Sequence, residues 1–241
     1  MFTISPKTDA LLRIDILNAF CPGGGLPVEG GDEIVPEVNE LSLAFKKAGA
    51  LIVDVQDYHP ADHKSFAATH GVEPFSLVDM PYGEQVAWPT HAVADTEDSE
   101  FHPDLMTELA SLVIRKGENR DIDSYSAFYE NDQVTKTGLA GYLRDKGITR
   151  VVLVGLAYDF CVGYSALDAR KEGFEVVVIK DLTRAIAMPL PVDPSNPEVV
   201  TNFGKTDPTT VDHMEIQFVE AGVYVAFHAE HAPVGNDTQI Y

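Results

Sequence analysis

Five short runs of apolar, largely β-branched residues recur along the chain, and segments with helical spacing lie between several of them. The runs cover residues 11–16, 50–55, 111–114, 151–154 and 174–179. They are continuous rather than alternating, which is typical of strands buried on both faces of a parallel sheet. Strand–helix alternation of this kind predicts a doubly wound three-layer α/β/α fold with a mainly parallel central sheet.

Two segments have apolar residues at helical spacing. In residues 32–49 these residues recur in steps of three and four: Ile34, Val38, Leu41, Phe45 and Ala48. We expect Asp32 to cap this helix and Gly49 to end it. In residues 159–173 the residues that share one helical face are Val162, Ala166 and Ala169. The second helix therefore follows the fourth predicted strand directly.

Two stretches lack clear periodicity. Residues 57–110 are rich in Pro, His and acidic residues, and a loop of that length inside a compact domain is usually functional. Residues 188–212 form a second irregular stretch, after which residues 214–227 predict a last strand or a hairpin. We expect one domain over residues 1–241, with a metal-binding loop region at about residues 57–110.

Composition narrows the classes of partner. The formal net charge of −21 argues against nucleic acid and against an anionic membrane surface, because both attract clustered Lys and Arg. A small neutral or cationic molecule, or a metal cation, suits such an acidic chain better as a ligand than an anionic partner does. No apolar stretch approaches the roughly 20 residues of a membrane span. With no secretory signal and only two cysteines, we expect a cytoplasmic protein.

Polar residues follow four of the predicted strands. Asp15 comes after the first strand, Asp57 and His59 after the second, Lys116 after the third and Cys161 after the fourth. In doubly wound folds, ligands bind outside the carboxyl ends of the strands, where the strand order reverses. We therefore expect these side chains to meet at one edge of the sheet.

Cys161 allows two interpretations. A lone cysteine is usually an inert, buried packing residue. In the first turn of a helix, however, the partial positive charge lowers the thiol pKa, and free backbone N–H groups can receive an oxyanion. Asp15 would then be a proton acceptor, and the alternative for this residue is a structural ion pair. Lys116 would supply a positive charge, and the alternative is an ordinary solvated lysine. Cys21, in a Gly-rich turn, is interpreted as structural.

Histidines and a carboxylate gather in the loop after the second strand. Asp57 and His59 are two residues apart, hence on one face of an extended segment, and His63 and His91 lie nearby. Imidazole with carboxylate suits zinc, manganese or iron. The alternative is chance, since the chain has eight histidines. Trp88 and Phe20 are either core residues or walls for a flat ring.

Six blocks carry a resemblance to a known family. They are IDILNAFCPGGGLPV (14–28), VQDYHPADHKSF (55–66), WPTHAV (88–93), EFHPDL (100–105), VIRKGENRDIDSYSAF (113–128) and VGLAYDFCVGYSALDA (154–169). In this order they resemble the nicotinamidase/pyrazinamidase enzymes of the isochorismatase-like cysteine hydrolases, over about residues 10–187. The blocks with histidines favour the nicotinamidase branch.

The resemblance implies roles for individual residues. It implies a catalytic triad of Asp15, Lys116 and Cys161. The implied ligands of one divalent ion (zinc, iron or manganese) are Asp57, His59 and His91, with His63 a further ligand in some members. A cis peptide bond between Leu156 and Ala157 is implied, with an oxyanion hole from the amides of Ala157 and Cys161. The candidate substrate-binding residues are Phe20, Trp88, Tyr125, Leu156 and Ala157.

The implied activity is hydrolysis of nicotinamide, and also of pyrazinamide, through a thioester on the cysteine. The expected partner is a small aromatic carboxamide, and a homo-oligomer is left open. Leu17 and Ala19 stand where the family usually has Gln and Asp, and Tyr58 and Ala92 replace a usual Trp and Cys. The alternatives are an amidase for another small carboxamide, a non-catalytic ligand-binding relative, and a metallohydrolase that uses only the histidines.

Overall fold

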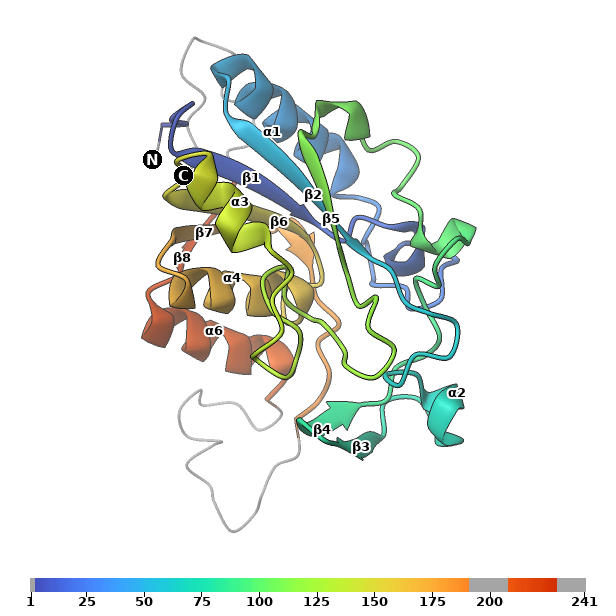
Figure 1. Cartoon of the computed structure of the whole chain (residues 1–241). Coiled ribbons are helices and arrows are strands. Elements are labelled where there is room, and N and C mark those ends of the chain that lie inside the picture. Colours follow the sequence, from blue (N-terminus) through green and yellow to red (C-terminus); the bar gives the residue numbers. More distant parts are fainter. Residues whose placement is uncertain (1–2, 191–207, 229–241) are drawn as a thin grey trace.

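The computed structural model describes residues 3–190 and 208–228. A six-stranded sheet with the order β5–β2–β1–β6–β7–β8 forms its centre, and all of its strand pairs are parallel (Figure 1). The strands are β1 (Asp9–Ile14), β2 (Leu51–Asp57), β5 (Leu112–Lys116), β6 (Arg150–Leu156), β7 (Glu175–Arg184) and β8 (Tyr224–Ala226). Each of the five apolar runs overlaps one of these strands, so the predicted fold class is confirmed.

Helices cover both faces of the sheet (Figure 1). One face packs against α1 (Val35–Ala48), and the other packs against α3 (Leu139–Asp145), α4 (Cys161–Lys171) and α6 (Thr210–Ala221). Successive strand residues point to opposite faces. Thus Leu11 belongs to the core beside α1, whereas Leu12 belongs to the core beside α3 and α4.

The start of α1 differs from the prediction. Ile34, not Asp32, occupies the N-cap position, and no side chain caps the helix. The Asp32 carbonyl instead accepts a hydrogen bond from the Val35 amide at 3.2 Å. Pro36 stands in the first turn, where its missing N–H costs no hydrogen bond. Gly49, with φ of 79°, ends the helix as expected.

The stretch 57–110 contains regular structure that the sequence did not reveal. It forms a short helix and an antiparallel hairpin, which lie apart from the main sheet (Figure 1). Short 3₁₀ turns follow the hairpin. The elements are α2 (Ala67–His70), β3 (Leu77–Met80), β4 (Gly83–Val86), η2 (Glu97–Ser99) and η3 (Thr107–Leu109). Another 3₁₀ turn, η1 (Asn18–Phe20), follows β1.

The last described segment is a helix followed by a strand. A last strand or a hairpin was expected in residues 214–227; this was wrong for residues 214–221, which belong to α6, and only β8 is a strand. Met214 and Phe218 lie one helical turn apart and bury their side chains against the α4 side of the sheet, and Thr209 and Asp212 form a capping box. Residues 191–207, most of the second irregular stretch, lie outside the described residues. No helix in the described ranges is both long and apolar enough to cross a membrane.

A buried ion pair joins the two strands on one side of the sheet centre. Arg13 on β1 and Asp54 on β2 are register partners, and neither side chain is exposed. The guanidinium donates to both carboxylate oxygens, at 2.6 and 2.8 Å, and also to the Met106 carbonyl. The neighbours of β1 are β2 and β6, so the direction of winding reverses at β1. The polar strand ends meet at this point.

Candidate active site

The Lys116 ammonium lies at the centre of the polar strand ends. Its Nζ is 2.9 Å from Asp15 Oδ2, 3.1 Å from Asp57 Oδ1 and 3.5 Å from Cys161 Sγ. It also donates to the Ser124 carbonyl at 2.9 Å. The four charged or thiol side chains are all buried. The structure therefore brings together the residues that follow the first four predicted strands.

Backbone geometry explains why these side chains converge. Asp15 has a left-handed φ of 46°, and its amide donates to the Val55 carbonyl at 3.1 Å, so the chain turns directly after β1. Gly155 on β6 has φ of 112°, and a Cβ there would lie 2.0 Å from the Ile14 carbonyl oxygen. Only glycine allows this close approach of β6 to the end of β1.

Burial and charge shift the pKa values of the central groups. Burial raises the pKa of the Asp15 carboxyl to about 6, and the Lys116 ammonium opposes this rise. Burial alone lowers the pKa of Lys116, but the carboxylates of Asp15 and Asp57 outweigh it and hold that pKa well above its usual value. The lysine is therefore a permanent cation between two carboxyl groups.

The thiol differs from the sequence-based expectation. Cys161 is the first residue of α4, as predicted. Burial nevertheless raises the pKa of its thiol well above the usual value; Lys116 opposes the shift and Asp15 adds to it. The expected lowering by the helix N-terminus was wrong for this enclosed position. The resting cysteine is a neutral thiol that needs a base.

Two backbone amides face no acceptor beside the thiol. The peptide bond between Leu156 and Ala157 is cis, as the family resemblance implied. The Ala157 carbonyl accepts hydrogen bonds from the amides of Phe160 and Val162, at 3.1 and 3.0 Å. Within residues 3–190 and 208–228, the amides of Ala157 and Cys161 donate no hydrogen bond. Both remain available to an anionic oxygen.

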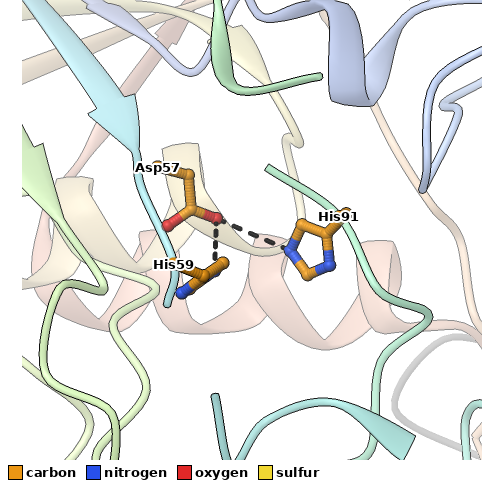
Figure 2. A group of neighbouring side chains, drawn as sticks. All are labelled: Asp57, His59 and His91. Carbon is orange, nitrogen blue, oxygen red and sulfur yellow. Dashed lines mark ion pairs between the residues drawn. The ribbon is translucent and has the colours of Figure 1, made fainter. Parts of the chain in front are cut away.

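A carboxylate and two imidazoles form a group that can hold a metal ion. Figure 2 shows Asp57 joined to His59 and to His91 by ion pairs. Asp57 Oδ2 is 3.0 Å from His59 Nε2 and 3.6 Å from His91 Nε2. The ligand atoms all lie within 4.8 Å of one another, and the three side chains are buried. His63 and Asp123 form a second such group with His59.

The hydrogen bonds of the first group fit a divalent cation. His59 Nδ1 is 3.0 Å from the Gly117 carbonyl, and His91 Nδ1 is 2.7 Å from the Pro89 carbonyl. A carbonyl only accepts, so each Nδ1 carries a hydrogen, and Nε2 is the ring nitrogen that faces Asp57 and would bind a metal ion beside it. Carbonyls that accept from the other ring nitrogen in this way orient metal-bound histidines. Gly117 has φ of 71°, and a Cβ there would lie 2.4 Å from the His59 ring.

A pocket opens over the thiol and the metal group. Its lining residues are Phe20, Leu26, Asp57, Trp88, His91, Asp123, Tyr125, Ala157, Phe160, Cys161 and Ile186. Four of the candidate substrate-binding residues are among them, namely Phe20, Trp88, Tyr125 and Ala157. Leu156 is not among the lining residues; its side chain is fully buried in the core. Leu17 and Ala19, which depart from the family pattern, are also buried outside this lining.

Several lining residues were missed from the sequence. Phe160 packs edge-on against Trp88, with ring centroids 4.9 Å apart, and its position directly before Cys161 was the available signal. Asp123 is buried and accepts a hydrogen bond from Gln85 on β4 at 2.8 Å. Gln85 also donates to the Tyr125 hydroxyl at 2.7 Å. The hairpin thus holds the polar side of the pocket, a contact that no local pattern indicates.

Comparison with known sequences gives the same family. Residues 9–190 match the Isochorismatase domain family. The chain is 51% identical over 180 residues to the nicotinamidase of Acinetobacter baylyi, covering 74% of this chain and 82% of the relative. It is 42% identical over 177 residues to the nicotinamidase of Escherichia coli, covering 73% and 83%.

Comparison with solved structures gives the same family. The nicotinamidase/pyrazinamidase of Acinetobacter baumanii matches with a TM-score of 0.79 and 40% identity, covering 92% of this chain and 97% of that one. PnC1 from L. infantum, in complex with nicotinate, matches with 0.74 and 35%, covering 94% and 96%. The pyrazinamidase of Pyrococcus horikoshii, in complex with zinc, matches with 0.66 and 34%, covering 91% and 98%. The chain therefore belongs to the isochorismatase family, in the group formed by the nicotinamidases and pyrazinamidases.

Proposed function

We propose that this chain is a metal-dependent cysteine amidohydrolase that converts nicotinamide to nicotinate and ammonia, with pyrazinamide as a second substrate. The observation that carries the proposal is the position of Lys116 Nζ, which lies within 3.5 Å of Asp15, Asp57 and Cys161 at the base of an aromatic pocket. The identity to two nicotinamidases and the likeness to a nicotinate complex support the substrate.

Acylation begins with a proton transfer. Asp15 takes the proton of the Cys161 thiol as the sulfur attacks the carboxamide carbon, and Lys116 stabilises the negative charge shared between them. The carbonyl oxygen becomes an oxyanion that accepts hydrogen bonds from the amides of Ala157 and Cys161. A donor at such a position contributes typically about 3–4 kcal/mol to the transition state.

Breakdown of the tetrahedral intermediate and hydrolysis of the resulting thioester complete the reaction. Asp15 returns its proton to the amide nitrogen, the C–N bond breaks, and ammonia leaves a thioester on Cys161. A water molecule then loses a proton to Asp15 and attacks the thioester carbon. The C–S bond breaks, the sulfur recovers a proton from Asp15, and the nicotinic acid that forms loses its remaining proton to solvent as nicotinate.

The metal ion has a positioning role in this proposal. Asp57, His59 and His91 would hold it, and their donor set fits zinc, iron or manganese. When bound, the ion supplies a Lewis acid that can ligate the ring nitrogen of the substrate or an ordered water. The zinc complex of the Pyrococcus horikoshii pyrazinamidase supports a divalent ion here.

The pocket walls suit a flat aromatic ring. Phe20, Trp88, Tyr125 and Phe160 line the pocket, and aromatic faces bind planar rings by stacking or edge contacts. Leu17 and Ala19 lie outside the lining, so their departure from the family pattern leaves the pocket surface unchanged. This favours nicotinamide over an unrelated carboxamide.

The proposal extends to the organisation and location of the enzyme. We assign residues 1–241 to one hydrolase domain in which the loop region 57–110 supplies the metal ligands. A cytoplasmic location is supported by the two cysteines, Cys21 and Cys161, which are both free and therefore suit a reducing compartment.

Trapping the thioester tests the proposal. Acid quenching of the metal-loaded enzyme during turnover of nicotinamide should leave a nicotinoyl group on the peptide that contains Cys161, as detected by mass spectrometry. The Cys21→Ala variant is the matched control and should give the same adduct. Turnover without an adduct, unaffected by alkylation of Cys161, would instead indicate a metallohydrolase.

A further inference from the structure

A buried carboxylate that the proposed reaction does not use lies in the turn between β6 and α4. Asp159 is only 2% exposed. Its Oδ1 accepts a hydrogen bond from the Ile186 amide at 3.0 Å, and its Oδ2 accepts one from the Ala187 amide at 2.8 Å. The Thr210 hydroxyl also donates to Oδ2. Burying a carboxylate is costly unless donors satisfy it, so Asp159 binds these three donors firmly.

The segment held in this way directly follows β7, and we call residues 185–188 the strap. The Ile186 and Ala187 amides donate to Asp159, and the Met188 amide donates to the Thr210 hydroxyl at 3.0 Å. Three successive strap amides thus depend on Asp159, two directly and one through Thr210. Ala187 has a left-handed φ of 55°, a conformation that a residue with a Cβ keeps only where its surroundings hold it.

The turn that carries Asp159 has supports that do not involve the strap. The Ala157 carbonyl accepts hydrogen bonds from the amides of Phe160 and Val162, and α4 continues the chain from this turn. The Ala157 amide in the same turn is one of the two that face no acceptor. Asp159 therefore links a braced part of the site to the strap, and loss of its carboxylate should release the strap first.

Ile186 is the residue through which the strap reaches the pocket. It lines the pocket together with Ala157, Phe160 and Cys161. Aromatic side chains contact the face or the edge of a planar ring, whereas a branched aliphatic side chain limits the space that is left for groups attached to that ring. The position of Ile186 thus controls the room beside a bound ring.

We propose that Asp159 is a positioning residue that fixes Ile186 as a wall of the pocket, and that Ile186 decides which ring-substituted carboxamides the pocket accepts. This inference rests on the proposed function and extends it to the choice among substrates. In a hydrophobic pocket, one methylene group changes kcat/KM by about 10–200-fold. Nicotinamides with a methyl group on a ring carbon are therefore suitable probes.

Selectivity kinetics on the metal-loaded protein test the inference. The readout is kcat/KM for each methylnicotinamide isomer divided by kcat/KM for nicotinamide. Ile186→Ala should raise this ratio at least about tenfold for at least one isomer. Asp159→Asn should raise it for the same isomer, because a carboxamide accepts through one oxygen only and leaves a strap amide unpaired. Ile186→Ala/Asp159→Asn should not exceed Ile186→Ala, since Asp159 acts through Ile186.

Asp9→Asn is the matched control. Asp9 is also a buried carboxylate that accepts from a backbone amide, that of Ser5 at 2.7 Å, but it begins β1, at the end away from the pocket. Its variant should keep the unmodified ratios. Amide hydrogen exchange in the peptide that spans the strap should be faster in Asp159→Asn than in the unmodified protein, and unchanged in Asp9→Asn.

A second variant covers a failure of Asp159→Asn to fold. Thr210→Val removes the hydroxyl that joins the Met188 amide to Asp159, and it should raise the ratio for the same isomer as Ile186→Ala. An unchanged ratio in Thr210→Val would then overturn the role of Asp159.

Unchanged ratios in Ile186→Ala would overturn the inference, as would unchanged ratios and exchange in Asp159→Asn. An equal fall in kcat for every amide in Asp159→Asn would also overturn it, because Asp159 would then support the oxyanion turn and not the wall. The proposed function fails separately, if the unmodified protein releases no ammonia from nicotinamide. The ratios are then taken from dissociation constants of the same amides, and strap exchange is read as before.

Discussion

Asp57 and Lys116 are register partners at the last positions of β2 and β5, and Lys116 Nζ lies 3.1 Å from Asp57 Oδ1. The other carboxylate oxygen of Asp57 lies 3.0 Å from His59 Nε2. One carboxylate thus joins the lysine to the metal-binding group, and the pairing of two neighbouring strands fixes their separation. Lys116 Nζ also lies 3.5 Å from Cys161 Sγ, so the lysine connects the proposed nucleophile to the proposed metal ligands.

Replacing Lys116 tests how far the site depends on its cation. Lys116→Met leaves Asp15 and Asp57 without their common partner in a buried position, where a lone carboxylate is costly. We expect kcat/KM for nicotinamide to fall at least about 100-fold, in the range lost with a positioned proton-transfer system. Steady-state kinetics on protein with verified metal content and unchanged circular dichroism measure this. A loss below tenfold would contradict the central role of Lys116.

The pKa of Asp15 sets the acid limb of the pH profile. The ionised carboxylate is the base, and burial raises its pKa to about 6. We therefore expect kcat/KM to fall below pH 6 by roughly tenfold per pH unit, because the protonated form cannot accept the thiol proton. Metal content measured at each pH separates this effect from protonation of the metal ligands. A flat profile down to pH 5 with retained metal would exclude Asp15 as the base.

The raised pKa of Asp15 also makes the stability of the fold depend on pH. Folded Asp15 binds its proton up to about pH 6, whereas an unfolded Asp releases it near its ordinary value of 3.8. The folded state therefore binds more protons between these values, and this group's contribution to stability declines as pH rises through that window.

Arg13 and Asp54 offer a prediction on stability. Arg13→Met leaves the fully buried Asp54 unpaired, and removing one partner of a buried pair costs about 3–5 kcal/mol. Urea unfolding should show this loss in the free energy of unfolding. The double variant Arg13→Met/Asp54→Leu should recover most of it, because no buried charge remains. A double variant as unstable as the single one would mean that the hydrogen bond from Arg13 to the Met106 carbonyl dominates.

The sequence predicted the sheet because its strands are continuous apolar runs, and it predicted the convergence of Asp15, Asp57, Lys116 and Cys161 because parallel strands end at one edge. The hairpin was missed because β3 and β4 have four residues each and Leu77 is 62% exposed, so no periodic pattern marks them. α6 was missed because Met214, Ile216 and Phe218 alternate with polar residues, a spacing typical of a strand.

Other parts of the site depend on tertiary structure. The loop after β5 brings Asp123 to the pocket and the Ser124 carbonyl to Lys116, and Asp123 is held there by Gln85 on the distant hairpin. The direction of the Cys161 pKa shift required knowing that the thiol is enclosed, because burial is the largest cause of its raised pKa. Neither fact follows from local spacing.

Ammonia release from nicotinamide, by the purified chain and by Cys161→Ala, tests the central claim most directly. We predict release by the unmodified protein and none by the variant, with the same metal content in both. Turnover retained by Cys161→Ala would contradict covalent catalysis, and no release from the metal-loaded unmodified protein would contradict the nicotinamidase assignment itself.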